Sequence, residues 1–360
     1  NGVGHLCDEL GVVMIPEFIA DQDELATEVY AANHGSRMRS SAPIQHLVDY
    51  SIRITSSGAR FTYPPELMDE DVAQAVRGVD LVLAGPPCQG HSNLNNHTRR
   101  TDPRNSLYLT VPAFAVAAEA PMCIIENVPG VVRDEHRVVE IAQQLFESEG
   151  YHVTAGFLSA ADLGWPQTRR RHFLIARKDK APVPLSVVRS LLRDQPRSLW
   201  WAIGHLEDFV SDDILDQVSE LSPENRARIE WLFREGEYEL ALTKRPESHR
   251  NGTTYTAVYG RMKKELPAPT ITTGFMTPGR GRFVHPTRPR VLTPREAARL
   301  QGFPDNYRFV TDPSNPPGRS LLAKWIGDAV PMPLGYAAAI SALAPGFPGQ
   351  AVKPGTAHHS

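Results

Sequence analysis

The stretch DLVLAGPPCQGHS, residues 80–92, joins an apolar run to an unusual loop. Residues 79–84 are typical of a buried strand. The run ends in a glycine and two prolines, and proline fixes its own φ and restricts the residue before it, so the loop is stiff. This loop holds Cys88, one of three cysteines in the chain. The sequence therefore predicts a rigid strand end that presents a thiol.

Strand-like and helical patterns alternate along the first half of the chain. Apolar runs predict strands at 122–125, 153–158 and 172–176, and helical patterns cover 113–120 and 136–149. Strands that alternate with helices form mainly parallel sheets, which bind ligands beyond the carboxyl ends of their strands. We therefore predict an α/β fold with a mainly parallel, doubly wound sheet.

The alternation stops after Arg177. Residues 180–290 are rich in Pro, Arg, Gly and Thr, with one clear helix near 223–235, and they predict a smaller, irregular domain. A strong helix start returns at residues 293–296, where Thr, Pro and Glu are spaced as in a capping box. The helix should end near Gly302. The predicted organisation is a larger domain from 1–179 and 291–343, a smaller one from 180–290, and a disordered tail from 344–360.

The composition is that of a soluble globular protein, with 41% hydrophobic and 22% charged residues. The net charge of −3 neither predicts nor excludes nucleic-acid binding, which depends on where the basic residues lie. The opening lacks a basic start, and no apolar run is long enough for a membrane span. Three scattered cysteines do not predict disulfides or a metal site. We expect a monomer in the cytoplasm, without a metal.

Cysteine and glutamate side chains follow two neighbouring predicted strands. The Cys88 thiol suits attack on an electron-poor carbon once it forms thiolate, although a lone cysteine is more often structural, as we interpret Cys7 and Cys123. Glu126 follows the strand at 122–125, so its carboxylate would face the same crevice and could hold or deliver a proton. A helix cap or a surface acid is the alternative interpretation of Glu126.

A run of arginines enters the predicted strand at 172–176. If the strand begins inside this run, Arg169 and Arg171 lie on one face and Arg170 on the other. Two arginines on one face could hold a phosphate or stabilise a developing anion. A solvated basic edge strand is the alternative.

Five blocks of sequence together resemble the DNA cytosine-C5 methyltransferase family. They occur in the order found in that family, and they are PPCQGHS, ENV, QTRRR, TPREAARLQGFP and IGDAVP. The resemblance runs from about residue 2 to 342 and is thinnest at 36–75 and 180–250. It implies a Rossmann-like methyltransferase sheet, residues 180–290 as a target-recognition domain, S-adenosyl-L-methionine as cofactor and double-stranded DNA as partner.

The resemblance also implies a mechanism. Cys88 would add to C6 of a cytosine flipped out of the duplex, which makes C5 nucleophilic enough to take the methyl group. Glu126 would contact the N3/N4 edge of the base and supply a proton. Arg171, with Arg169, would support the redistribution of charge. The stiff loop would then aim the thiol at a base that arrives from outside.

The implied cofactor site combines residues from both ends of the chain. It comprises the glycine-rich turn Gly2, Val3 and Gly4, the strand-end acid Asp21, the more doubtfully matched acid Asp49, and Pro86, Leu107, Asp328 and Ala329. His5 replaces a glycine and Asp328 an asparagine of the family pattern, and the stretch from Asp49 to Asp80 is longer than expected. The family's first strand is absent from the sequence, so we expect a trimmed chain or a start further upstream.

Contacts to DNA are expected from two regions. In the loop after Cys88, which closes over DNA in the family, they are Gln89, Ser92, Arg99 and Arg100; in the recognition region, they are Arg261, Arg280 and Arg282. Alternative functions are an RNA cytosine-C5 methyltransferase of the same family, a catalytically inactive DNA-binding module, and a nucleotide enzyme that also uses a cysteine on C6. A restriction-modification role would be compatible with a bacterial source, although the sequence itself does not indicate one.

Overall fold

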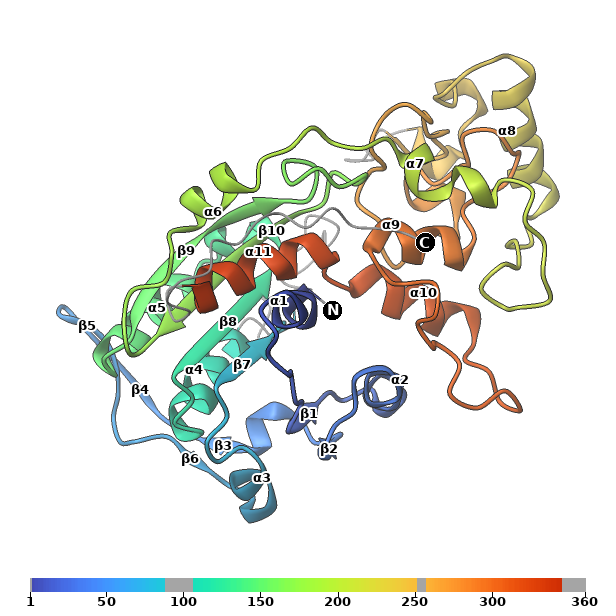
Figure 1. The fold of residues 1–360 in the computed structure, drawn as a ribbon. Helices are drawn as coiled ribbons and strands as arrows, with labels where there is room; N and C mark the ends of the chain where they lie inside the picture. Colours follow the sequence, from blue (N-terminus) through green and yellow to red (C-terminus); the bar gives the residue numbers. More distant parts are fainter. Residues whose placement is uncertain (1, 88–105, 251–256, 345–360) are drawn as a thin grey trace. The chain divides into compact units, whose positions relative to one another are not determined.

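The computed structural model describes residues 2–87, 106–250 and 257–344, and these form two compact units (Figure 1). The first unit takes residues up to 158, then 170–193 and the end of the chain from 334. The second takes residues 159–169 and 194–333. The second unit is thus larger than the irregular region 180–290, and most of the predicted return segment 291–343 belongs to it. The predicted tail lies almost wholly outside the described residues.

The first unit holds the sheets. Its elements in chain order are α1 (Gly2–Glu9), β1 (Phe18–Ala20), α2 (Glu24–His34), β2 (Met38–Ser40), η1 (Ile44–His46), β3 (Val48–Asp49), β4 (Ile52–Thr55), β5 (Gly58–Phe61), β6 (Glu66–Leu67), α3 (Glu70–Ala75), β7 (Leu81–Ala84), α4 (Leu107–Ala117), β8 (Met122–Asn127), η3 (Pro129–Arg133), α5 (Val138–Ser148), β9 (His152–Ser159), β10 (Arg170–Arg177), α6 (Leu185–Leu191) and α11 (Met332–Leu343).

The main sheet has four strands in the order β7-β8-β10-β9. Strands β7 and β8 are parallel, but β10 runs antiparallel to β8, so the sheet is mixed and the prediction of a mainly parallel sheet is wrong. The reason lies in the connection from β9 to β10. Only residues 160–169 separate these two strands, and they contain no helix, whereas parallel neighbours need a long crossover.

The other strands of the first unit form three two-stranded sheets. Strands β1 and β2 form a separate parallel pair, and β3 pairs antiparallel with β6. Strands β4 and β5 form an antiparallel hairpin, and the backbone N–H of Ala59 in β5 donates to Gln144 Oε1 of α5, 2.8 Å away. This hairpin accounts for the unexpected length of the chain between Asp49 and Asp80.

Helices α4 and α5 bury their apolar stripes with one face of the main sheet. The predicted stripe of α5 is confirmed, because Val138, Ala142, Leu145 and Phe146 are all buried. The stripe meets residues such as Ile125 of β8 in a single hydrophobic cluster. This packing holds β8 and β10 rigidly, and these are the strands that carry Glu126 and Arg171.

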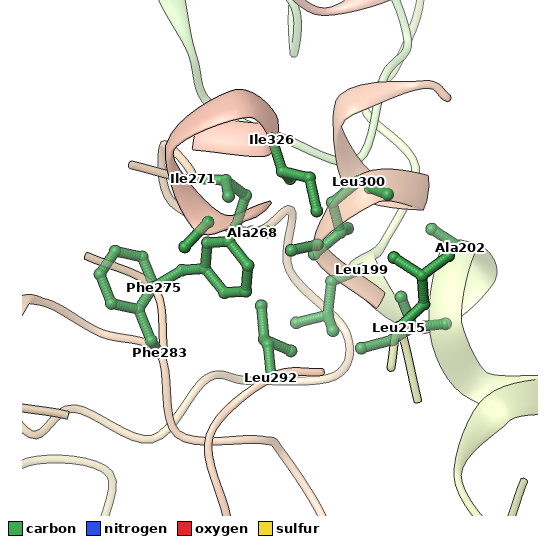
Figure 2. Close-up of a cluster of buried hydrophobic side chains, with 14 of the residues drawn as sticks. Leu199, Ala202, Leu215, Ala268, Ile271, Phe275, Phe283, Leu292, Leu300 and Ile326 are labelled. Atoms are coloured by element: carbon green, nitrogen blue, oxygen red, sulfur yellow. The ribbon is translucent and has the colours of Figure 1, made fainter. Parts of the chain in front are cut away.

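The second unit is built from helices and irregular segments. Its elements are α7 (Leu199–Ile203), η4 (Gly204–Leu206), α8 (Pro223–Arg234), η5 (Leu242–Lys244), η6 (Glu247–His249), η7 (Pro278–Arg280), α9 (Pro294–Gln301) and α10 (Arg319–Asp328). Figure 2 shows its main core, in which Leu199, Phe275, Leu300 and Ile326 meet side by side. Segments far apart in the sequence therefore share one hydrophobic interior.

One helical stretch, 319–343, has the length and apolar composition of a membrane span. It includes α10 and α11, which are separated at residues 329–331, and 61% of its most apolar window is buried within the protein. A buried core helix passes the same test of length and composition. Burial within the protein explains why the stretch is apolar.

The predicted helix start at Thr293 is confirmed as a full capping box on α9. Its Glu296 is 1% exposed and also accepts two hydrogen bonds from Arg290, at 2.8 and 2.7 Å. His285 Nε2 lies 3.3 Å from Glu296 Oε1. Burial on its own would raise the pKa of Glu296, but Arg290 and His285 stabilise the carboxylate and hold the pKa at about 2.

Replacing this buried carboxylate should destabilise the fold in a pH-dependent way. Glu296→Gln should lower the free energy of unfolding by about 3 kcal/mol at pH 7, because it leaves Arg290 buried without its partner. The folded-state pKa is depressed, so the wild-type advantage is present above the ordinary pKa of 4.5 and is lost as the pH falls towards about 2. Urea unfolding at a series of pH values measures the difference.

The matched control is Glu265→Gln. Glu265 is 66% exposed and lies 4.0 Å from Lys264, so its replacement should leave the free energy of unfolding almost unchanged. An equal effect of the two substitutions, or a wild-type advantage that does not shrink with acid, would contradict the assignment.

Candidate functional site

An ion pair joins two of the predicted catalytic residues on the main sheet. Arg171 Nε lies 2.8 Å from Glu126 Oε1, and both side chains are largely buried. The strand register explains the contact: Glu126 pairs with Phe173, and Arg171 lies two residues before Phe173 on the same face. Glu126 and Arg171 therefore meet on one face of the main sheet.

The stiff loop after β7 lies beside this ion pair. Ala84 pairs with Ile125, which places Gly85 next to Glu126, and a Cβ on Gly85 would lie 3.7 Å from Glu126 Oε2. Asn127 Nδ2 donates to the carbonyl oxygen of Pro86 at 3.2 Å. The loop backbone is thus tied to the end of β8, and the chain continues from it into Cys88.

Cys88 lies outside the described residues, as do Gln89, Ser92, Arg99 and Arg100. Their predicted roles stay predictions. The other two cysteines are buried as expected, and burial raises the pKa of Cys7 and of Cys123, which keeps both thiols protonated.

The three consecutive arginines have three different environments. Strand β10 begins at Arg170, so Arg169 precedes the strand, and the prediction that Arg169 and Arg171 share a strand face is wrong. Arg169 donates to backbone carbonyls of the second unit instead. Arg170 is exposed and lies over the ring of Phe157, 4.2 Å from its centroid. Arg171 pairs with Glu126.

Tyr108 and His172 are buried titratable side chains on α4 and β10. Tyr108 is 1% exposed and its hydroxyl group has no hydrogen-bond partner among the described residues, and burial, with Cys123 and Glu126 nearby, raises its pKa. His172, opposite Asn127 on the neighbouring strand, is also buried, which lowers its pKa to about 4. Both side chains are therefore neutral at physiological pH, and the alternation along β10 places His172 on the sheet face opposite the ion pair.

The predicted glycine-rich turn is helical. Gly2, Val3 and Gly4 form the first turn of α1, so they do not form a separate turn before a helix. Asp21 follows β1 as predicted, but the N-cap of α2 is Asp23, whose side chain accepts from Ala26 N–H. Asp21 is exposed, and its Oδ1 accepts from the backbone N–H of Asp23 at 2.8 Å. Asp23, and not Asp21, therefore caps α2.

The remaining predicted cofactor residues of the first unit lie at element ends. Asp49 is the last residue of β3, is exposed, and accepts a hydrogen bond from Tyr63 Oη at 3.0 Å. Leu107 is the first residue of α4, and Pro86 is in the loop after β7.

The two predicted cofactor residues of the second unit form the end of α10. Asp328 is the last helical residue, and its side chain points to solvent near Lys324, at 3.7 Å. Ala329 is the C-cap. Their carbonyls, and those of Ile326 and Gly327, accept hydrogen bonds from two buried side chains of the second unit, Arg169 and Gln301.

Two of the three arginines proposed as DNA contacts are engaged within the second unit. Arg261 lies over the rings of Phe233 and Tyr238, and its Nε donates to a backbone carbonyl. Arg282 forms an ion pair with Glu239 at 2.6 Å. These contacts support structural roles for Arg261 and Arg282. The Arg280 guanidinium is exposed and makes no hydrogen bond or ion pair with the described part of the chain.

The family model of C-5 cytosine-specific DNA methylases matches residues 17–342. The chain belongs to this family. The Type II methyltransferase M1.BsuMI of Bacillus subtilis is 38% identical over 344 residues, which cover 95% of this chain and 77% of that protein. The Type II methylase M.HgiDII of Herpetosiphon aurantiacus is 31% identical, over 71% of this chain and 73% of that protein. The chain is thus a DNA (cytosine-5-)-methyltransferase, as the five sequence blocks predicted.

Solved structures share the fold. The S. pombe Dnmt2 methyltransferase aligns with a TM-score of 0.58 at 15% identity, covering 96% of this chain and 97% of that one. The Entamoeba histolytica methyltransferase EhMeth aligns with a TM-score of 0.54 at 14% identity, covering 93% of each chain. The α/β class of this methyltransferase is therefore confirmed.

Two residues that shape the end of α10, Gln301 of α9 and Gly327 of α10, escaped the sequence analysis. Gln301 belongs to the TPREAARLQGFP block, but nothing in the block indicates that its side chain donates to the end of a helix more than twenty residues later. Gly327 lies where a Cβ would come within 2.3 Å of the Thr273 backbone nitrogen. A buried polar residue on an otherwise apolar helix face was the available signal for Gln301.

Substitutions in the arginine run should separate the residue at the site from its neighbour. Arg171→Ala should lower the methylation rate by about 100-fold or more, because it leaves Glu126 without its charge partner. Arg170→Ala should change the rate by about twofold or less, since Arg170 stacks on an aromatic ring at the surface. Initial rates of methyl transfer to mixed duplex DNA measure both. Similar losses in the two variants would contradict the assigned geometry.

Proposed function

We propose that this methyltransferase transfers the methyl group of S-adenosyl-L-methionine to C5 of a flipped cytosine in duplex DNA through a covalent bond from Cys88 to C6. The observation that carries the proposal is the buried ion pair between Glu126 and Arg171 beside the loop Gly85–Pro87. Membership of the cytosine-C5 family supports the type of reaction, and the ion pair supports the choice of Glu126 and Arg171 as residues that take part in it.

The proposed reaction begins with bond formation from the Cys88 sulfur to C6 of cytosine. Negative charge then spreads over the ring, and Glu126, which takes up a proton from solvent before the attack, gives this proton to N3. The carboxylate that remains is stabilised by Arg171, which already donates to it. The C5 carbon, now electron-rich, would take the methyl group as the bond from that group to the cofactor's sulfur breaks and its electron pair stays on the sulfur. A base would then take the C5 proton, the electrons of the C5–H bond would re-form the C5–C6 double bond, and the Cys88 sulfur would leave C6 as thiolate while N3 returns its proton to Glu126.

The residues present fit S-adenosylmethionine. Its ribose hydroxyls need an acceptor at a strand end, and Asp21 is exposed after β1 while Asp23 caps the following helix. Gly2 and Gly4, at the start of α1, would offer backbone close to the ligand. Asp49, Pro86, Leu107, Asp328 and Ala329 complete the proposed set. When bound, the cofactor supplies an electrophilic methyl group.

Recognition of double-stranded DNA is proposed for the second unit. Arg280 supports it, because its guanidinium is exposed while most neighbouring cations have partners within the chain. Arginine reads guanine through two hydrogen bonds in the major groove. The relatives named Type II methyltransferases support a role in a restriction-modification system, and such a role places the enzyme with DNA in the cytoplasm.

A mechanism-based adduct tests the covalent step. Duplex DNA of mixed sequence that carries 5-fluorocytosine cannot lose its C5 substituent as a proton, so the bond to sulfur should persist after methyl transfer. Wild-type protein with labelled cofactor should give a stable protein–DNA band on denaturing gels, and Cys88→Ser should give none.

Two controls define the outcome. Cys123→Ser removes a buried thiol that has no task in the reaction, so this variant should still form the adduct. Adduct on RNA but not on duplex DNA would favour the RNA enzyme, and no adduct on any substrate would favour an inactive binding module.

Arg280 should contribute more to DNA affinity than an exposed arginine elsewhere in the second unit. Arg280→Ala should weaken binding to the duplex that the enzyme methylates by about tenfold. This is the loss of affinity expected when one arginine–guanine contact is removed. The matched control is Arg226→Ala on α8, also exposed, which should leave the dissociation constant nearly unchanged. Fluorescence anisotropy at fixed salt measures both. Equal effects of the two substitutions would show a general electrostatic contribution instead.

A further inference from the structure

Three buried polar side chains gather near the C-terminal end of α10 in the second unit. They are Gln167, Arg169 and Gln301, and none is more than 2% exposed. A helix cannot satisfy its last four carbonyls with its own N–H groups. Ile326 and Gly327, at this end of α10, are buried, so their carbonyls need donors from other parts of the chain.

Arg169 and Gln301 provide those donors. Gln301 Nε2 donates to the carbonyls of Ile326 and Ala329, at 2.6 and 3.1 Å. Arg169 donates to the carbonyl of Gly327 through one terminal nitrogen, at 3.0 Å, and to that of Asp328 through the other, at 3.4 Å. The guanidinium charge lies at the negative end of the helix, where it is favourable.

The same guanidinium reaches a second segment. Its Nη1 also donates to the carbonyl of Ile271, at 2.6 Å. The end of α10 and this segment are in close contact, because a Cβ on Gly327 would come within 2.4 Å of the Thr272 carbonyl carbon. Arg169 therefore joins the turn after α10 to the segment that leads towards Arg280.

The backbone around Arg169 is fixed independently. Thr168 N–H donates to the carbonyl of Ala268 at 2.8 Å, and Gln167 Nε2 donates to Gln301 Oε1 at 3.0 Å. Arg169 is thus held by neighbours within the second unit, in an environment different from that of Arg171.

We propose that Arg169 is a positioning residue that holds the turn at Asp328 and Ala329 in the conformation that binds the cofactor. The inference rests on the proposed function, which places this turn at S-adenosylmethionine. A residue with this task changes the affinity for the cofactor, whereas a residue at the reacting base changes the rate at saturating cofactor.

Arg169→Lys tests the proposal. Lysine keeps the positive charge but lacks the planar guanidinium group. It therefore cannot donate hydrogen bonds to the carbonyls of Ile271, Gly327 and Asp328 at the same time. The KM for S-adenosylmethionine should rise about tenfold, as for other supporting contacts around a site. The kcat and the rate of adduct formation at saturating cofactor should stay within about twofold of wild type. Arg171→Lys, the matched control, should lower kcat and leave this KM unchanged.

Hydrogen exchange gives a readout that does not depend on activity. Peptides that cover residues 325–331 and 270–275 should exchange faster in Arg169→Lys than in wild type, at a temperature well below unfolding of either protein. If Arg169→Lys does not fold, Arg169→Gln, which retains a side-chain donor, should show the same pattern.

An unchanged KM, or a loss confined to kcat, would overturn the positioning role. A wild-type protein that methylates no duplex would overturn the proposed function instead. In that case equilibrium dialysis with labelled S-adenosylmethionine and the exchange rates still decide the inference: equal affinity and equal exchange in wild type and variant would overturn it.

Discussion

The start of β10 at Arg170 is the constraint on which the site depends. Because the strand begins there, Arg171 shares a face with Glu126, and the antiparallel register with β8 brings the two side chains to 2.8 Å. Arg169, one residue before the strand, turns to carbonyls of the second unit. A shift of one residue would exchange the faces of these side chains and separate the ion pair.

Two buried polar clusters organise the second unit, which has no extended sheet of its own among the described residues. One is centred on Glu296 with Arg290 and His285, and it holds the start of α9. The other joins Gln301, at the end of the same helix, to Arg169 and the end of α10. Each satisfies backbone groups that a helix end leaves without partners, so polar burial here specifies how irregular segments are arranged.

Several arginines of the second unit interact with other residues of that unit. Arg261 stacks on an aromatic ring, and Arg282 and Arg295 form ion pairs with acidic residues. The sequence alone does not distinguish these arginines from exposed ones. This internal pairing explains how a chain of net charge −3 can still belong to a family of DNA-modifying enzymes, since only cations without internal partners face a polyanion. Arg280, the last residue of η7, is exposed and forms no hydrogen bond or ion pair with the residues that the structure describes.

The sequence by itself determined the family, the α/β class, the capping box at Thr293 and the stripe of α5, because these depend on local spacing and on five ordered blocks. It also indicated Glu126 and Arg171 as candidate site residues, although not that they form an ion pair. Tertiary structure decided that pairing, the mixed sheet, the helical conformation of Gly2–Gly4 and the roles of Arg169 and Gln301. These depend on strand register and on contacts between residues more than a hundred positions apart, and local periodicity carries no information about either.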